Sequence, residues 1–290
     1  MNSLVTGGAG FIGSHLVEKL IDKNFNVVVI DNLSTGHIQN ISHLKKKCKF
    51  IKADISKKNN KWIKLFKNQK YIFHLAALAD IVPSIENPEK YFKSNVVGTL
   101  NVLEACKKYK IKKIIYTASS SSFGIPKNYP TKEHEKINPL YPYAFTKNQA
   151  EQLIFHWSKI YKIPYISLRL FNVYGTRSRT SGTYGAMFGV FLTQKLFGKP
   201  FTVVGNGRQT RDFTYVTDVV NALIMSAKSK IKNDVFNVGS GKTISVNKIV
   251  KILNGSKIQI PKRPGEPDCT FANITKIRRK LNWKPKINIE

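Results

Sequence analysis

The stretch Thr6-Gly-Gly-Ala-Gly-Phe-Ile-Gly13 decides the fold. It follows a short β-branched run, Leu4–Thr6, and leads into an amphipathic pattern, Phe11–Asp22, so it joins a predicted strand to a predicted helix. Three glycines recur in it at intervals of three, and they are Gly7, Gly10 and Gly13. Glycines so placed allow a tight turn, close approach of the backbone to a pyrophosphate, and close packing of helix on strand. The stretch therefore predicts the first unit of a dinucleotide-binding sheet.

An acidic residue ends the second predicted strand, Asn26–Asp31. In a dinucleotide-binding sheet, a carboxylate at this point accepts hydrogen bonds from the adenosine ribose and disfavours a 2′-phosphate there. Asp31 therefore predicts NAD rather than NADP as the cofactor. Asp54 ends the third predicted strand, and we expect it near the adenine.

Strands and helices alternate through the first half of the chain. Further strands are predicted at Phe50–Ala53, Tyr71–Leu75, Lys113–Thr117 and Ile166–Leu170, and further helices at Val96–Lys108 and Tyr143–Tyr161. This alternation predicts an α/β fold, a doubly wound parallel Rossmann sheet with helices on both faces.

The rhythm breaks after Phe171. A glycine-rich and aromatic stretch is followed by a short predicted helix, a strand and a Pro/Gly loop, at Gly175–Gly189, Val190–Phe197, Thr202–Val204 and Pro261–Pro267. We therefore expect an NAD-binding domain over residues 1–172. A smaller, mixed C-terminal substrate-binding region is expected over residues 173–290, with interleaved contacts between the two.

The charge balance is unusual, with a formal net charge of +31 from 48 basic and 17 acidic residues. Forty of the basic residues are lysine and eight are arginine, although phosphate recognition favours the planar fork of arginine. Clusters such as Lys45–Lys47, Lys57–Lys58 and Lys107–Lys108 are scattered along the sequence. The charge is therefore interpreted mainly as solvated surface, and a nucleic-acid-binding protein on a Rossmann fold is kept as the alternative from another class.

Three cysteines, Cys48, Cys106 and Cys269, lie far apart. Their odd number and wide spacing predict neither a disulfide framework nor a metal site, and they are typical of a cytoplasmic protein. No apolar run approaches the ~20 residues of a membrane span, so no membrane partner is expected.

Tyr143 and Lys147 are four residues apart in a predicted helix, which places both side chains on one face. A neighbouring ammonium favours the phenolate and is expected to lower the tyrosine pKa, so Tyr143 could serve as a general base and acid. A second pair with this spacing, Tyr109 and Lys113, straddles a helix end and is interpreted as structural. The run Ser119–Ser122 follows a predicted strand, where ligands bind in open parallel sheets. Its first hydroxyl could meet Tyr143, and its last two serines are interpreted as loop residues.

Eight motifs in this order resemble the extended short-chain dehydrogenase/reductase superfamily. Within its nucleotide-sugar epimerase/dehydratase branch, the chain is most similar to the UDP-hexose 4-epimerases, from Leu4 to about Pro285. The motifs are Thr6-Gly-Gly-Ala-Gly-Phe-Ile-Gly13, Asp31-Asn-Leu-Ser-Thr-Gly36, His74-Leu-Ala-Ala77, Asn95-Val-Val-Gly-Thr99, Ser119, Tyr143-x-x-x-Lys147, Arg169-Leu-Phe-Asn-Val-Tyr-Gly175 and Arg211-Asp-Phe-Thr-Tyr-Val216.

The resemblance implies a role for each matching residue. Tyr143 would be the acid/base, Lys147 its partner and Ser119 the catalytic hydroxyl. Together with the glycine turn, it implies an NAD site formed by Gly7, Gly10, Phe11, Ile12, Gly13, Asp31, Asn32, Asp54, Ile55, Leu75, Ala76, Ala77, Asn95, Tyr143 and Lys147. It implies a UDP-sugar site formed by Ser119, Ser120, Asn172, Arg211, Arg263, Glu266 and Thr270.

The resemblance also bears on the reaction. Related 4,6-dehydratases and decarboxylases carry acidic residues just after the catalytic hydroxyl, where this chain has Ser120 and Ser121. Without those acids, the expected outcome is epimerisation at C4 through a transient 4-keto sugar. A UDP-glucuronate epimerase or decarboxylase, or an NDP-sugar 4,6-dehydratase, remains an alternative.

Substrate and assembly follow as further expectations. Thr270, seven residues past Arg263, is a small residue where similar epimerases limit the sugar's substituents. The hypothesis is therefore turnover of UDP-glucose and UDP-galactose, with room for the UDP-GlcNAc and UDP-GalNAc pair. The resemblance further implies a homodimer that packs through the helices predicted at Val96–Lys108 and Tyr143–Tyr161.

Overall fold

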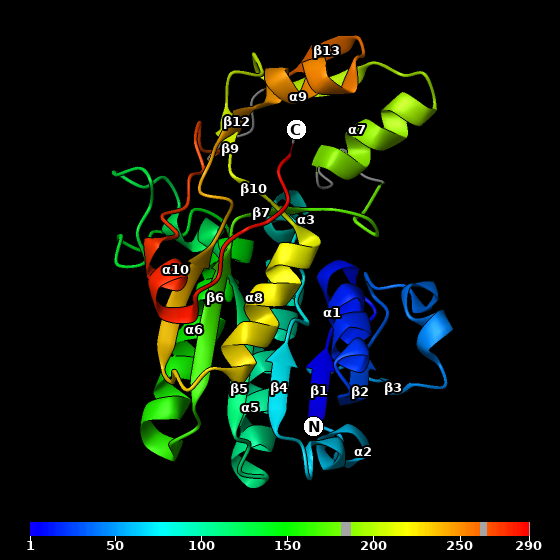
Figure 1. Cartoon of the computed structure of the whole chain (residues 1–290), viewed down its shortest axis with the longest axis vertical. Coiled ribbons are helices and arrows are strands. Elements are labelled where there is room, and N and C mark those ends of the chain that lie inside the picture. The colour runs from blue at the N-terminus through cyan, green and yellow to red at the C-terminus, as the bar shows by residue number, and fades with distance from the viewer. Residues whose placement is uncertain (181–186, 262–265, 290) are drawn as a thin grey trace.

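The computed structural model describes residues 1–180, 187–261 and 266–289 of the chain. Its main layer is a seven-stranded sheet in the order β11-β6-β5-β4-β1-β2-β3, and each neighbouring pair is parallel (Figure 1). The strands are β1 (Asn2–Thr6), β2 (Asn26–Asp31), β3 (Cys48–Lys52), β4 (Tyr71–His74), β5 (Lys113–Ser119), β6 (Tyr165–Leu170) and β11 (Asp234–Val238). Because the strands run outward from β1 in both directions, the predicted doubly wound α/β fold is confirmed.

Helices cover both faces of this sheet. Successive side chains of a strand point to opposite faces, so Leu4 packs beneath α5 and α6 while Val5 packs beneath α1 and α8. These four helices are α1 (Phe11–Asp22), α5 (Gly98–Lys108), α6 (Pro142–Tyr161) and α8 (Val216–Lys228). Burial on both faces explains why the strands read as continuous apolar runs rather than alternating ones.

Shorter elements fill the connections along the sheet. They are η1 (Ile38–Asn40), η2 (Ser42–Leu44), α2 (Asn60–Ile63), η3 (Lys64–Phe66), α3 (Ile81–Glu86), α4 (Pro88–Tyr91), η4 (Phe92–Val97) and η5 (Ser120–Phe123). The helix predicted at Val96–Lys108 is regular only from Gly98, because Phe92–Val97 forms a π-helical turn that continues α4 into α5. Hydrophobic periodicity does not reveal such a local change of winding.

The rest of the chain forms a smaller region above the carboxyl ends of the strands (Figure 1). It contains three two-stranded pairs, β7 with β10, β8 with β13, and β9 with β12. Their bounds are β7 (Asn172–Tyr174), β8 (Phe201–Val204), β9 (Thr210–Arg211), β10 (Phe213–Tyr215), β12 (Ile244–Ser245) and β13 (Lys257–Ile260). Its helices are α7 (Met187–Leu196) and α9 (Val246–Leu253), and α10 (Thr275–Leu281) packs beside β11. A separate apolar core that includes Phe191, Phe201 and Ile249 holds this region together.

Two elements from beyond residue 173 belong to the main sheet. Strand β11 pairs with β6, and α8 packs against α1. A division at 172/173 therefore separates segments of the chain rather than layers of the fold. We keep it as a proposal about which segment binds the cofactor and which binds the substrate.

Within the described residues, no helix is both long and apolar enough to cross a bilayer. The same part of the chain holds no group of three or more His, Cys, Asp or Glu side chains arranged to bind a metal ion.

Candidate active site

A cavity of about 910 Å³ lies between the carboxyl ends of the main sheet and the smaller region. Crevices at this edge of open parallel sheets are where ligands bind. The structure brings most of the predicted site residues to its wall. They are Gly7, Gly10, Phe11, Ile12, Gly13, Asp31, Asn32, Asp54, Ile55, Leu75, Ala76, Ala77, Ser119, Ser120, Tyr143, Lys147, Asn172, Arg211, Glu266 and Thr270.

Two predicted residues are not placed there. Asn95 lies behind the wall, 1% exposed, where its side-chain amide bonds both backbone groups of Leu78 and donates to Thr146 Oγ1 at 3.0 Å. Its side chain holds the loop after β4 against helix α6, and its assignment to the cofactor site stays a prediction. Arg263 lies outside the described residues.

The glycine turn leaves room for a pyrophosphate beside the backbone. Gly7 has φ +74°, and a Cβ added there would lie 2.7 Å from the backbone nitrogen of Ala76. Gly10 caps α1 without a side chain, so the first-turn N–H groups of that helix face the cavity unobstructed. A helix N-terminus with open N–H groups suits an anionic phosphate, and these residues therefore fit the diphosphate of a dinucleotide.

Asp31 is fixed by the backbone before any ligand binds. Its Oδ2 accepts from Ala9 N at 3.0 Å and its Oδ1 from Leu33 N at 2.8 Å. Burial raises the pKa of this carboxyl, whereas the two N–H bonds act in the opposite direction. Each oxygen keeps a second lone pair, so the carboxylate can still accept bonds from ribose hydroxyls.

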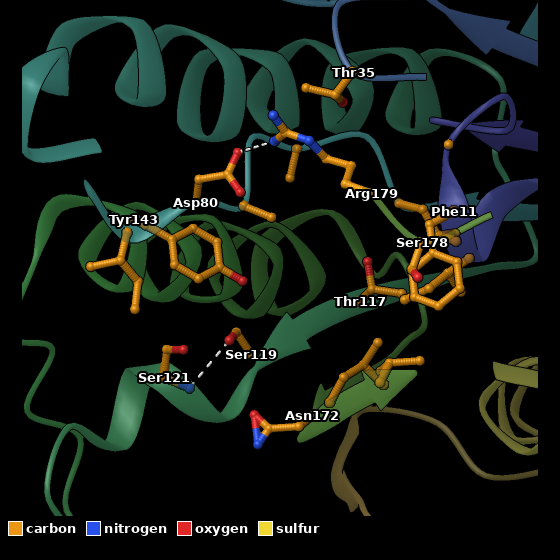
Figure 2. A pocket seen from close by; sticks show the side chains of 18 of the residues that line it. Phe11, Thr35, Asp80, Thr117, Ser119, Ser121, Tyr143, Asn172, Ser178 and Arg179 are labelled. Atoms are coloured by element: carbon orange, nitrogen blue, oxygen red, sulfur yellow. Dashed lines mark hydrogen bonds and ion pairs between the residues drawn. The ribbon is translucent and has the colours of Figure 1, made fainter. Parts of the chain in front are cut away.

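Ser119 and Tyr143 meet at the centre of the cavity. Ser119 ends β5, and its Oγ accepts from Ser121 N at 3.1 Å (Figure 2). Its hydroxyl is close enough to the Tyr143 phenol to act on the pKa of that tyrosine and lower it. Ser121 itself lines the cavity, so its interpretation as a loop residue is corrected. The serine run turns into η5 here and directs both side chains inward.

Lys147 lies one helical turn beyond Tyr143 and is 4% exposed. Burial lowers the pKa of Lys147 to about 7, while the Glu151 carboxylate opposes that change. Burial also raises the pKa of Tyr143 to about 12, although the Ser119 hydrogen bond lowers it. The expected fall in the tyrosine pKa is therefore wrong for the protein without ligand, because desolvation penalises both charged forms more than the pairing favours them.

Sequence reasoning missed many polar residues of the cavity wall, and three of them lie near Tyr143. Asp80 and Arg179 form an ion pair above the Tyr143 ring, and they come from the loop after β4 and the segment after β7 (Figure 2). Tyr141 stacks on Tyr143 with ring centroids 6.4 Å apart, and the neighbouring Ser121 side chain acts to lower its pKa against the effect of burial. The repeated tyrosine in Tyr-Pro-Tyr was a usable signal for Tyr141. No local pattern links Asp80 to a residue 99 positions away.

The substrate end of the cavity is built from the smaller region. Asn172 donates to Thr270 Oγ1 at 3.1 Å, which ties β7 to the segment that follows β13. Arg211 and Glu266 form an ion pair at 2.8 Å. The second carboxylate oxygen of Glu266 is buried and has no hydrogen-bond partner among the described residues. A ligand hydroxyl or N–H would satisfy that oxygen.

Comparisons with known proteins agree with this geometry. The family model for GDP-mannose 4,6 dehydratases matches residues 4–290. A putative UDP-glucose 4-epimerase of Methanocaldococcus jannaschii is 39% identical over 99% of this chain and 94% of its own length. The chain is also 36% identical to the crystallised UDP-N-acetylglucosamine 4-epimerase of Methanobrevibacter ruminantium, with a TM-score of 0.93 over 98% of this chain and 93% of that one.

A third relative was solved with a cofactor. The UDP-glucuronic acid 4-epimerase of Bacillus cereus, in complex with UDP-glucuronic acid and NAD, has a TM-score of 0.91 and 33% identity over 99% of this chain and 95% of that one. The chain therefore belongs to the NAD-dependent nucleotide-sugar epimerases of the short-chain dehydrogenase/reductase type.

Proposed function

We propose that the protein interconverts the C4 epimers of a UDP-hexose, with UDP-glucose and UDP-galactose as its main pair. The observation that carries this proposal is the meeting of Ser119, Tyr143 and Lys147 in the cavity that also holds the glycine turn. A base, a cofactor site and a sugar site must adjoin in a redox epimerisation.

NAD, held by the glycine turn and Asp31, would supply the acceptor and donor of the hydride at the sugar carbon. Tyr143 takes the proton of the 4-hydroxyl and gives it back, while Ser119 holds that hydroxyl by a hydrogen bond. The Lys147 ammonium stabilises the Tyr143 phenolate once ligands fill the cavity and the proton has moved. These residues thus keep one proton available to the C4 oxygen, whichever face the rotated 4-keto sugar presents.

Elimination of water needs a further acid near the sugar. Ser120 and Ser121 follow the catalytic hydroxyl, and neither can supply a proton at neutral pH. Asp80 is the carboxylate whose charge acts on Tyr143, and it is already engaged in an ion pair with Arg179. This arrangement favours epimerisation over a 4,6-dehydratase.

The N-acetylated pair, UDP-GlcNAc and UDP-GalNAc, is proposed as a second substrate pair. Thr270 is small, and its hydroxyl accepts from Asn172 and from the Asp212 backbone. Because these contacts hold Thr270 against β7 and β9, its side chain does not extend into the cavity as a larger residue would.

UDP-glucuronate is the alternative substrate, and Arg179 is the observation in its favour. A uronate carboxylate needs a cation, and the Arg179 guanidinium lines the cavity beside Tyr143. Its charge is already neutralised by Asp80, so a uronate would have to displace that carboxylate. This competition ranks the neutral hexoses first.

The test is a UDP-sugar panel supplied without added NAD. Purified enzyme receives UDP-glucose, UDP-GlcNAc or UDP-glucuronate, and products are identified by NMR. UDP-galactose from the first substrate supports the main proposal, and no UDP-GalNAc from the second would remove the N-acetyl part. Turnover of glucuronate alone would favour the alternative, while a deoxy or decarboxylated product would overturn 4-epimerisation.

A homodimer through α5 and α6 is also proposed. Leu103 and Ile154 belong to these helices but are buried in the protein's own core. Phe145 and Ile160, near the two ends of α6, and Phe92 of η4 are exposed apolar side chains that a partner could cover. Light scattering on the peak from a size-exclusion column should give twice the 32.9 kDa chain mass, and a Phe145→Glu variant should elute as a monomer.

A cytoplasmic location is likewise proposed, since Cys48, Cys106 and Cys269 are all free thiols.

A further inference from the structure

The lysines that look scattered in the sequence gather at one edge of the main sheet. Six connections lead into strands β2, β3, β4, β5, β6 and β11, and in a parallel sheet all of them lie at the edge where the strands begin. That edge is the lower end of Figure 1, around the N-terminus, and it is opposite the active-site cavity. Each connection carries at least one exposed lysine. The set, here called the basic edge, is Lys23, Lys45, Lys46, Lys47, Lys67, Lys70, Lys110, Lys112, Lys162, Lys230 and Lys232.

No opposite charge lies within these connections. The segments 23–25, 45–47, 67–70, 109–112, 162–164 and 229–233 contain neither Asp nor Glu. The adjoining carboxylates are Asp22, which ends α1, and Asp234, which begins β11. Asp234 is already paired with Lys276 at 2.6 Å and Lys280 at 2.8 Å. The basic edge is therefore a face of nearly uniform positive charge.

Lysines from different connections act on one another there. Lys113 begins β5, and its ammonium donates to the backbone oxygens of Ser226 at 3.1 Å and Ser229 at 2.8 Å. Burial lowers the pKa of Lys113 to about 8, and the charges of Lys112 and Lys232 lower it further. Two lysines 120 positions apart in the chain thus repel a third, which shows that the connections converge.

Against the expectation that no membrane is a partner, which rested only on the lack of a spanning segment, we infer that the basic edge docks the enzyme on the surface of an anionic lipid bilayer, with the active site facing away from it. Each lysine near an anionic bilayer adds to the electrostatic attraction. The six connections lie at one edge of the sheet, so their charges can face the same membrane surface. The cavity opens at the opposite edge, so docking would leave the path of the nucleotide sugar free.

The composition of the edge favours a bilayer over a nucleic acid. All eight arginines, which bind phosphates and base edges as a fork, lie outside these connections. Binding of single-stranded RNA also uses exposed aromatic rings. The aromatic residues of the connections are Phe25, which is buried, and Tyr109, which is half-buried. These connections therefore carry diffuse positive charge, without the arginines and exposed aromatic rings that recognise bases.

The test is co-sedimentation of the full-length enzyme with vesicles. One set contains equal parts of phosphatidylglycerol and phosphatidylcholine, and the other contains phosphatidylcholine alone. The edge variant combines Lys110→Gln, Lys112→Gln, Lys230→Gln and Lys232→Gln. The control variant combines Lys199→Gln, Lys242→Gln, Lys251→Gln and Lys284→Gln, which removes the same charge from exposed lysines elsewhere.

The wild type should sediment with the anionic vesicles at about 0.05 M salt and should be released from them at about 0.5 M salt. It should not bind the neutral vesicles. The edge variant should lose at least about tenfold in affinity, whereas the control should stay within about twofold. Both variants should keep wild-type turnover, and loss of repulsion around Lys113 should leave the edge variant no less stable. Equal losses of vesicle affinity in the two variants would overturn the proposal. So would a wild-type protein that does not bind the anionic vesicles. Tighter binding to transfer RNA than to vesicles, lost in the edge variant, would assign the edge to nucleic acid instead.

Discussion

The ammonium of Lys147 lies 4.3 Å from the centroid of the Tyr116 ring. Tyr116 is 1% exposed, and its hydroxyl donates to the backbone oxygen of Lys147 at 3.3 Å. Behind it, the His74 ring lies 5.6 Å away, held between the hydroxyls of Thr6 and Thr99. Burial and the Lys147 charge lower the pKa of His74 to about 3, so this imidazole stays neutral. The rigid stack makes Tyr116 a positioning residue for Lys147.

Replacing Tyr116 with leucine should therefore shift the pH dependence of turnover. The groups around Lys147 are the Tyr116 ring, Glu151, which opposes the fall in its pKa, and His74 from β4, which stays neutral. An aromatic face favours the ammonium, so its loss should lower the pKa of Lys147 further. The alkaline limb of the kcat profile should then move down by about half to one pH unit. Tyr116→Phe keeps the ring face and should keep the wild-type profile. A leucine variant with unchanged pH dependence would show that the ring only fills space.

Tyr143→Phe should lower kcat by about 10²–10⁴-fold, since general acid–base transfer contributes that much. The cofactor content should not change, because the glycine turn and Asp31 hold the dinucleotide. Denaturing the protein and measuring released NAD checks the second point, and NMR of UDP-galactose formation checks the first. If the variant kept a tenth of wild-type turnover, another group would have to carry the proton.

Thr270→Tyr should separate the two proposed substrate pairs. The larger side chain would extend toward Asn172 and occupy the space proposed for the N-acetyl group. We expect kcat/KM for UDP-GlcNAc to fall at least about tenfold relative to UDP-glucose, the size of a strong steric penalty in a pocket. Thr270→Val preserves the shape without the hydroxyl and serves as the control. Equal losses for both sugars would mean that position 270 does not sense the acetamido group.

The Asp80 and Arg179 pair distinguishes neutral sugars from uronates. A double variant, Asp80→Asn with Arg179→Gln, removes both charges and leaves no uncompensated partner. Turnover of UDP-glucose should change by less than about threefold, because an exposed ion pair contributes little by itself. If UDP-glucuronate were the substrate, its kcat/KM should instead fall at least about tenfold with the loss of a charge-assisted bond. Kinetics with both sugars on the same preparation settles the ranking.

The sequence predicted those features that local pattern controls. Helix Phe11–Asp22 and strand Asn26–Asp31 have the predicted bounds because their apolar periodicity and flanking glycine or asparagine are local. Strand β5 runs two residues further than its β-branched run, since pairing with β6 continues to Ser119. That extension brings the Ser119 hydroxyl under Tyr143. Nothing in the local pattern of residues 113–119 sets it.

Other features depend on contacts between distant parts of the chain. The amide of Asn95 has partners from a loop and a helix, so it packs behind the wall that its motif suggested it would line. The pKa of Tyr143 depends on the depth of burial, which a spacing of four residues does not measure. Likewise, the connections that make the basic edge become neighbours only when the sheet forms. Most of the site residues predicted from the sequence therefore do line the cavity, but the sequence did not reveal the charge relations among them.

Lys113 offers a test of that edge through stability. Its folded pKa of about 8 lies below the ordinary value of 10.5, so between these values the unfolded chain binds more protons than the folded one. Stability should therefore rise with pH through this window, and the penalty for the charged form should be full below about pH 8. Because solvent reaches the neighbouring lysines, we expect about 1 kcal/mol rather than the full shift. Urea unfolding at several pH values should show this rise in the wild type and a smaller one in Lys113→Met, while Lys159→Met, at an exposed site, should match the wild type. Parallel curves for all three proteins would contradict a strained charge at the start of β5.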